Sequence, residues 1–220
     1  MAKVTLHQGD CLEFMKTLDP SSVDAVITDQ PYGIEHSSGW ESSWVGTEIA
    51  GDGDTALRDA VVEWAEANSI PWVMFGTWKM PRPAATKAVL VWDKGPASGM
   101  GDLSFPWKLS WEEIYIGGDR WRGKRDEGVL RGHFITPFEK SGRKHPHQKP
   151  VSLILEFIRK LPHGSMIFDP FMGSGTTGVA CVKAGASFIG CEVDPHHFAT
   201  AERRIEEARP TLFAALSGVE

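Results

Sequence analysis

Short apolar runs alternate with amphipathic stretches along most of the chain. Continuous apolar runs of this length are typical of strands that are buried on both faces. They predict seven strands, at residues 3–6, 23–28, 71–75, 89–92, 113–116, 166–168 and 188–191. Apolar residues at helical spacing occupy most of the intervals, so we expect helices to cover both faces of the sheet. The pattern predicts an α/β fold with three layers and a doubly wound, mostly parallel, seven-stranded sheet of the Rossmann-like kind.

Two segments depart from this alternation. Residues 34–53 contain glycine, serine and tryptophan with no period, and we expect a mobile loop there. Residues 117–149 carry nine Lys and Arg against four acids, which makes them a basic stretch in an otherwise acidic chain. The length of 220 residues suits a single domain over residues 1–220 that contains both segments.

A glycine-rich stretch, FDPFMGSGTTGVA at residues 168–180, directly follows one predicted strand and opens a helix. Gly173, Gly175 and Gly178 let the chain turn sharply and let a ligand approach the backbone. The N–H groups at the start of the helix then face that ligand. Strand, glycine loop and helix together predict a nucleotide-type cofactor site.

Two acidic residues, and the lack of a lysine in the loop, decide which cofactor fits. The loop lacks the Lys of phosphate-binding loops, and Asp169 would repel a pyrophosphate but attract an ammonium group. Glu192 ends the next strand 19 residues after Gly173, where ribose hydroxyls are bound in such units. A cofactor with an amino-acid head, a ribose and no phosphate is S-adenosylmethionine. The alternative is a nicotinamide-dependent oxidoreductase, which is disfavoured by Asp169 and by the missing second mononucleotide-binding half.

The end of the chain implies how the sheet is completed. Only one predicted helix follows Glu192, so the strand beside it must be the first strand of the chain. Asp10 follows that first strand and would then lie beside Glu192, where it would reach the adenine of the cofactor.

Composition narrows the class of protein further. A net charge of −6, with 41% hydrophobic and 24% charged residues, is ordinary for a soluble protein and argues against a uniformly basic nucleic-acid binder. The three cysteines show no metal spacing and indicate free thiols in a reducing cytoplasm. His196 and His197 are adjacent on a predicted helix and point apart, so we expect no metal. We also expect no membrane contact, because the chain shows no long apolar run and no signal-peptide core.

Four short motifs resemble those of one family. Residues 29–32, Asp-Gln-Pro-Tyr, resemble a D-P-P-Y motif, and residues 145–150, HPHQKP, resemble an H-P-x-Q-K-P run. The loop from Asp169 resembles the family's cofactor loop, and residues 9–11 and 190–192 resemble its adenine- and ribose-binding corners. The chain thus resembles the amino-group (adenine-N6 or cytosine-N4) DNA methyltransferases, in the permuted order in which the catalytic motif precedes the cofactor motif. By this resemblance the cofactor-binding residues are Asp10, Cys11, Asp29, His147, Lys149, Phe168, Asp169, Pro170, Phe171, Gly173, Ser174, Gly175, Thr176, Thr177, Glu192 and Val193.

The resemblance implies catalytic roles for Asp29, Gln30, Pro31 and Tyr32. An exocyclic amine is a poor nucleophile because its lone pair is delocalised into the base. Asp29 and the carbonyl of residue 30 would accept its two N–H groups, while Tyr32 stacks on a base flipped out of the duplex. Asp at position 29 favours adenine, because the family's cytosine enzymes more often carry Ser there. Gln30 stands where the family has proline, so we expect a weakened or altered activity, or an inactive variant that still binds.

The basic stretch is the predicted DNA contact. By the resemblance, residues 117–147 would form a target-recognition insert on double-stranded DNA. The candidate nucleic-acid contacts are Arg120, Arg122, Lys124, Arg125, Arg143 and Lys144. Methylation of RNA or of a protein amide, and a DNA-binding protein without activity, are the alternatives. The sequence leaves open the recognition sequence, a homodimer, and whether the protein is an orphan bacterial or phage enzyme or part of a restriction–modification pair.

Overall fold

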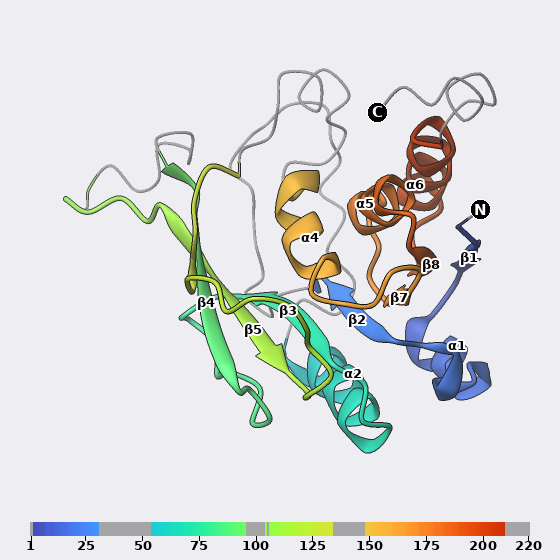
Figure 1. Cartoon of the computed structure of the whole chain (residues 1–220), viewed down its shortest axis with the longest axis horizontal. Coiled ribbons are helices and arrows are strands. Elements are labelled where there is room, and N and C mark those ends of the chain that lie inside the picture. The colour runs from blue at the N-terminus through green and yellow to red at the C-terminus, as the bar shows by residue number, and fades with distance from the viewer. Residues whose placement is uncertain (1, 31–53, 96–103, 105, 134–147, 210–220) are drawn as a thin grey trace.

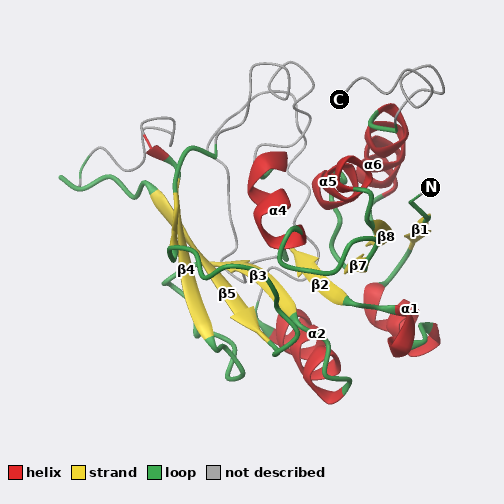
Figure 2. Cartoon of the chain, in the orientation of Figure 1, coloured by secondary structure: helices red, strands yellow, loops and turns green. Residues whose placement is uncertain are grey.

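The computed structural model describes residues 2–30, 54–95, 104, 106–133 and 148–209. In this part of the chain, eight strands form one sheet: β1 Val4–Gln8, β2 Ala25–Thr28, β3 Trp72–Gly76, β4 Ala88–Asp93, β5 Trp111–Gly117, β6 Val129–Leu130, β7 Met166–Asp169 and β8 Ser187–Glu192. The helices are α1 Cys11–Thr17, α2 Ala56–Ala67, α4 Val151–Ile158, α5 Thr176–Ala184 and α6 Pro195–Glu207, with a short 3-10 helix at Pro20–Ser22 (Figures 1 and 2). The predicted α/β fold is confirmed. The additional strand, β6, has two residues and lies in the stretch predicted to be an insert.

The strands lie in the order β1-β8-β7-β2-β3-β5-β4-β6. Neighbours from β1 to β3 are parallel, whereas β5 is antiparallel to both β3 and β4. The register of β1 and β8 sets Gln8 opposite Glu192. The prediction that the first strand of the chain lies beside the strand ending at Glu192 is therefore confirmed.

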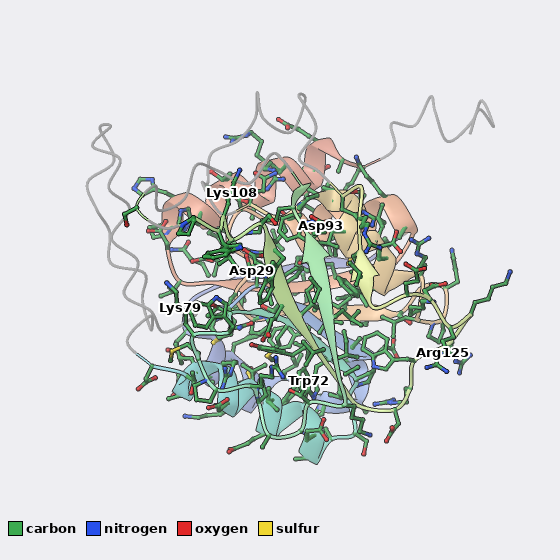
Figure 3. The ribbon with its side chains drawn as sticks, turned by 90° about the vertical axis from the view of Figure 1, so that its left-hand side faces the viewer. Asp29, Trp72, Lys79, Asp93, Lys108 and Arg125 are labelled. Carbon is green, nitrogen blue, oxygen red and sulfur yellow. The ribbon has the colours of Figure 1, made fainter. Side chains whose placement is uncertain are left out.

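The directions of the strands define two edges of the sheet. The five parallel strands end at one edge, here called the carboxyl edge, and β4 also ends there because it is antiparallel to β5. In contrast, β5 begins at the carboxyl edge and ends at Gly117 on the other side, here called the opposite edge. Figure 3 shows Asp93, the end of β4, and Trp72, the start of β3, at different ends of the sheet. Open α/β sheets bind their ligands at the carboxyl ends of the strands.

Helices cover both faces of the sheet (Figure 1), and a hydrophobic core lies between the helices and the sheet on each face. Phe157 of α4, Val179 of α5 and Ile205 of α6 belong to one core, and Met15 of α1 and Val61 of α2 belong to the other. Successive residues of β3 enter the two cores in turn, as the alternation of side chains along a strand requires. The sheet is thus buried between helices on both faces, which explains the continuous apolar runs of its strands.

Candidate active site at the carboxyl edge

Asp29 and Asp169 lie close together at the carboxyl edge, at the ends of the paired strands β2 and β7. Thr28 donates a hydrogen bond from Oγ1 to Asp169 Oδ1 at 2.6 Å, and the backbone N–H of Phe171 donates to the same oxygen at 3.1 Å. Burial, with a smaller contribution from the charge of Asp29, raises the pKa of Asp169 to about 7, against the lowering effect of hydrogen bonds from Thr28 and Thr177. The structure therefore places the predicted catalytic acid and the predicted cofactor acid on the same side of the sheet.

The glycine loop between β7 and α5 leaves room at one position. The backbone N–H of Met172 donates to the carbonyl of Cys191 at 2.9 Å, which ties the loop to β8. Gly173 follows with a φ of +51°, and among the described residues a Cβ atom there would meet only the carbonyl of Phe171, at 4.0 Å. The positive φ favours glycine, and the open space suits the close approach of a ligand.

Two other glycines, Gly175 at the end of the loop and Gly178 within α5, are required by packing. A Cβ atom on Gly175, which has a φ of +81°, would lie 2.8 Å from Cβ of Ala201. A Cβ atom on Gly178 would lie 2.4 Å from Cδ1 of Ile205. The sequence explains these glycines by a sharp turn and by ligand approach, whereas in the structure they also let α6 lie directly against the start of α5.

The start of α5 is buried and is held by a side chain that the sequence analysis missed. Ser174, Thr176 and Thr177 are all buried. Arg204 of α6 donates hydrogen bonds to the backbone carbonyl and to Oγ of Ser174, the latter at 2.8 Å. No motif marks Arg204 in the sequence, because it reaches the loop only through the packing of α6.

Glu192 joins the ends of β8, β1 and the glycine loop. Its Oε2 accepts the backbone N–H of Gly173 at 2.9 Å, and its carbonyl accepts the N–H of Gly9, also at 2.9 Å. Asp10 follows Gly9 and caps α1, because its Oδ1 accepts two N–H groups of the first helical turn. The predicted proximity of Asp10 and Glu192 is thus confirmed by the pairing of β1 with β8.

The other predicted cofactor-binding residues differ in burial and in whether their side chains line the carboxyl edge. Cys11 is the buried first residue of α1, and Val193, next to Glu192, is 54% exposed. Phe168 is fully buried and packs in the core on the side of α1 and α2, so its side chain does not line the edge. Phe171 packs partly against the same core.

Lys149 lies against the predicted catalytic acid. Its Nζ is 2.8 Å from Oδ2 of Asp29 and 3.3 Å from Oε2 of Glu112 on β5. Glu112 Oε1 is in turn 2.5 Å from Nζ of Lys94, which follows β4. Burial alone would lower the pKa of Lys149, but Asp29 and Glu112 outweigh it and the pKa is raised. Burial would likewise raise the pKa of Glu112, but Lys149 and Lys94 outweigh it and the pKa is lowered.

Gln30 is buried and ties the segment after β2 to the neighbouring strand. Its Nε2 donates a hydrogen bond to the backbone carbonyl of Phe75 on β3, at 2.5 Å. Its Oε1 is buried and has no hydrogen-bond partner among the residues that the structure describes. A buried carbonyl without a donor costs about 1–3 kcal/mol of stability. The Gln30 side chain therefore makes one stabilising hydrogen bond and carries one costly unpaired acceptor.

Several predicted site residues lie outside the described part of the chain. They are Pro31, Tyr32, Arg143, Lys144, His147 and the loop at 34–53. Their roles stay predictions.

The part of the basic stretch that directly follows β5 lies at the opposite edge, whereas Arg131, after β6, lies 4.0 Å from Asp93 at the carboxyl edge. Arg120 donates to the carbonyl of Ser69, just before β3, and the backbone N–H of Arg122 donates to the carbonyl of Lys160 after α4. Lys160 also donates to the backbone carbonyl of Lys124. Figure 3 shows Arg125 on the far side of the molecule from Lys79 and Lys108, with Asp29 on their side. The structure does not bring Arg120, Arg122, Lys124 or Arg125 to Asp29, and their contact with nucleic acid stays a prediction.

Two exposed tryptophans stand on loops at the carboxyl edge. Trp78 follows β3 and is 59% exposed, and Trp107 precedes β5 and is 73% exposed. Each is followed by a lysine, Lys79 and Lys108, that is also exposed. The pairing of Gly76 with Glu113 puts both loops at the same end of the sheet as Asp29.

The described residues offer neither a metal site nor a membrane span. No group of three or more His, Cys, Asp or Glu side chains in them is arranged to hold a metal ion. None of the helices in the described ranges has the length and apolarity of a membrane span. All three cysteines are buried free thiols.

Comparison with known proteins gives the class of this fold. The chain resembles the solved structure of M1.HpyAVI with SAM, with a TM-score of 0.64, 22% identity, and 92% of this chain and 98% of that chain covered. It also resembles the PvuII DNA methyltransferase, which is cytosine-N4-specific, with a TM-score of 0.64, 15% identity, and 93% and 86% of the two chains covered. The sheet and the carboxylates at its edge thus define a Rossmann-like methyltransferase fold.

The sequence comparisons give the family. A DNA methylase family model matches residues 85–203, more than half of the chain. The type II methyltransferase M2.MboI of Moraxella bovis is 26% identical over 243 residues, which cover 94% of this chain and 89% of that protein. The chain belongs to the DNA methylase family of amino-group methyltransferases.

Proposed function

We propose that the protein is an S-adenosylmethionine-dependent DNA methyltransferase that modifies the exocyclic amine of adenine in a flipped-out nucleotide. One observation carries the proposal: Asp29 and Asp169 share the carboxyl edge, and Thr28 binds Asp169 at 2.6 Å. Asp29 belongs to the motif expected to hold the base, and Asp169 to the loop expected to hold the cofactor. Methyl transfer requires its two reactants to be held side by side, and these two motifs supply adjacent places for them.

The residues around the glycine loop fit S-adenosylmethionine by their chemistry. Asp169 suits the ammonium group of the cofactor, and the N-terminal N–H groups of α5 suit its carboxylate. Glu192 already accepts backbone N–H groups, but a carboxylate has about four lone-pair sites, so ribose hydroxyls can bind as well. Val193, an exposed apolar side chain, and Asp10 suit the adenine. When bound, the cofactor supplies a methyl group activated by a sulfonium.

The chain's own residues act on the base amine. Asp29 and the backbone carbonyl of Gln30 accept hydrogen bonds from its two N–H groups and draw the nitrogen toward a tetrahedral shape with its lone pair forward. Tyr32 stacks on the flipped base and holds its plane. Positioning and electrostatics, rather than a covalent intermediate, then supply most of the rate.

The identity of the base rests on Asp29. A carboxylate accepts hydrogen bonds from either base amine, and adenine is preferred because the cytosine enzymes that the chain resembles more often carry Ser at this position. The likeness to the PvuII enzyme, which is cytosine-N4-specific, concerns the fold alone. Cytosine is therefore the competing base, and the experiment below reports both.

Gln30 favours a second candidate function, a homologue that binds DNA and cofactor but transfers methyl groups slowly. Its side chain occupies a buried position where the resemblance expects proline, and within the described part of the chain its Oε1 has no hydrogen-bond partner. A misdirected carbonyl at residue 30 would lose one of the two acceptors for the amine.

Duplex DNA is proposed to approach the carboxyl edge. Asp29 is there, and a base cannot be modified while it is stacked in the duplex. The exposed Trp78 and Trp107 offer faces for stacking, and the adjacent Lys79 and Lys108 offer charge to phosphates. These four residues supplement the contacts expected from the basic stretch.

The test is to express the protein in a bacterium that lacks adenine-N6 and cytosine-N4 methylation, and to sequence its genomic DNA for both modifications. We expect methylated adenine in one sequence context. Methylated cytosine would transfer the proposal to the competing base. Unmodified DNA together with tight binding of labelled S-adenosylmethionine would favour the binding homologue, and unmodified DNA without cofactor binding would end the proposal.

A further inference from the structure

We infer that Lys149, supported by Glu112 and Lys94, is a positioning residue for the carboxylate of Asp29. The resemblance instead assigns Lys149 to cofactor binding. The inference rests on the proposed function, because it concerns the acid that receives the base amine, and it adds two residues that no motif contains.

The first argument is the confinement of the ammonium group. Lys149 is 6% exposed, and its Nζ lies 2.8 Å from Asp29 Oδ2, 3.3 Å from Glu112 Oε2 and 4.9 Å from the ring centre of Phe75. A lysine side chain is long and normally free to rotate, but here carboxylates and a ring face restrict it. Asp29 consequently has one oxygen fixed by a short charged hydrogen bond, while 30% of its side chain stays exposed toward the edge.

The second argument is the balance of charge. Burying a charged group costs free energy unless the charge is paired. A single carboxylate would also fix the position of the Lys149 ammonium less firmly than two partners do. Glu112 gives Lys149 a second partner, and Lys94, which is partly exposed, neutralises Glu112 at 2.5 Å. The four side chains alternate in sign and connect β2, β5 and β4 at the carboxyl edge. The ion pairs of Lys149 therefore link Asp29 to β5 and, through Glu112 and Lys94, to the end of β4.

The third argument is direction. In the order β8-β7-β2-β3-β5, the cofactor acid Glu192 lies on one side of β2, and Glu112 lies on the other. The ion pairs of Lys149 extend from Asp29 toward β5, which is away from Glu192. Its position therefore suits the alignment of Asp29 better than the binding of the adenosyl group.

The experiment separates the methyl-transfer step from cofactor binding. Lys149→Met removes the ammonium and keeps most of the apolar stem. We expect the single-turnover rate on unmethylated genomic DNA, at saturating tritiated S-adenosylmethionine, to fall about 100-fold, as a misplacement of reacting groups does. The Kd for the labelled cofactor, measured by equilibrium dialysis, should change by less than about threefold, since the contacts of the glycine loop remain.

A double variant guards against a purely structural reading. Lys149→Met leaves the buried carboxylate of Glu112 with one partner fewer, so the unfolding temperature should fall. Adding Glu112→Gln removes that buried charge and should restore much of the lost unfolding temperature. The rate should stay low in the double variant. The matched control is Arg82→Met, because Arg82 pairs with Glu113, the next residue on β5, at 2.6 Å. It should lower thermal stability without slowing methyl transfer.

The outcomes are distinct. A normal rate with a cofactor Kd raised more than about tenfold in Lys149→Met would return Lys149 to the cofactor site. Recovery of the rate in the double variant would overturn the inference, because only folding would then have been at fault. A wild-type protein with no methyl transfer would overturn the proposed function and the inference with it, whereas an active wild type with a fully active Lys149→Met would overturn the inference alone.

Discussion

The carboxyl edge and the opposite edge of the sheet differ in how their charges are used. At the carboxyl edge, Asp29, Asp169 and Glu192 end three strands that are neighbours or next neighbours in the sheet. At the opposite edge, the charges just after β5 serve the fold: Lys160 pairs with Asp126 at 2.5 Å, and Arg120 binds a backbone carbonyl. Charges at the opposite edge thus hold loops to the fold, whereas those at the carboxyl edge gather around the predicted catalytic acid.

The difference teaches that motif and topology locate a site more reliably than composition does. The acids of the carboxyl edge come from distant parts of the chain, and parallel pairing brings them together. The basic stretch is continuous in sequence, yet it follows a strand, β5, that runs the other way. Its nine cations therefore identify a basic segment but not where each cation lies: Arg120 is at the opposite edge, and Lys149, the last of the nine, contacts Asp29 at the carboxyl edge.

The largest expected effect comes from the acid at the centre of the carboxyl edge. Asp29→Ala removes an acceptor for the amine and a partner of Lys149, and we expect methyl transfer to fall by about 1,000-fold, the range seen when a stabilising group is deleted from an active site. The measurement is the single-turnover rate with labelled cofactor. Asp126→Ala, which removes a paired carboxylate at the opposite edge, is the matched control and should leave the rate unchanged. An equal loss of methyl-transfer rate in the two variants would contradict the inference that only the carboxyl edge takes part in the chemistry.

The second effect is a pH dependence of cofactor affinity. Burial raises the pKa of Asp169 to about 7, so the carboxylate that attracts the ammonium is present above pH 7 and is lost below it. The affinity for S-adenosylmethionine should fall about tenfold from pH 8 to pH 6, and it should decline again above pH 8, where an α-amino group loses its proton. Calorimetric titration across this range is the measurement. Asp169→Asn should bind weakly and should lose the dependence between pH 6 and pH 8; a dependence that survives would assign it to another group.

The same raised pKa has a consequence for folding. A neutral Asp169 is easier to bury than a charged one, so it favours the folded state at low pH. That contribution is fully present below the ordinary pKa of aspartate, about 3.9, and is lost as pH rises through about 7. The free energy of unfolding of the wild type should therefore decline over this window relative to that of Asp169→Asn.

Much of the fold and part of the site could be predicted from sequence because they depend on local patterns. Apolar runs mark the strands, the glycine loop marks Asp169, and the count of helices after Glu192 places β1 beside β8. The direction of β5 has no local signal, because apolar residues look alike in parallel and antiparallel strands. Lys94 and Glu112 were missed for that reason: they meet only once β4 and β5 are paired.

The third effect concerns how DNA meets the carboxyl edge. Lys79→Ala combined with Lys108→Ala should weaken duplex binding by about fivefold to tenfold near 0.1 M salt and reduce the salt slope by about two, as the loss of two phosphate contacts does. Fluorescence anisotropy with a labelled duplex at several salt concentrations is the measurement. An unchanged slope would mean that these lysines do not face the DNA.

The fourth effect concerns Gln30. Gln30→Pro should raise the methyl-transfer rate about twofold to fivefold, because a fixed φ is worth about 0.4–1 kcal/mol of preorganisation. Gln30→Ala is the matched control: it removes the hydrogen bond to the Phe75 carbonyl without adding the ring, so it should lower the rate. If Gln30→Pro gave no gain in rate, Gln30 would not limit activity. The hydrogen bond from Gln30 to the Phe75 carbonyl would then hold the backbone as well as proline does.

The smallest effect is expected at the opposite edge. Arg122→Ala combined with Arg125→Ala removes two cations from the basic stretch, but β5 carries that stretch away from Asp29. A phosphate contact of a flipped nucleotide must lie near the acid that holds its base, so duplex affinity should change by less than about twofold and the salt slope by less than about one unit. The same anisotropy titration compares this variant directly with the Lys79 and Lys108 pair. A larger loss here than at the carboxyl edge would mean that the duplex extends around the sheet to the opposite edge, and would restore the role that the sequence predicts for these arginines.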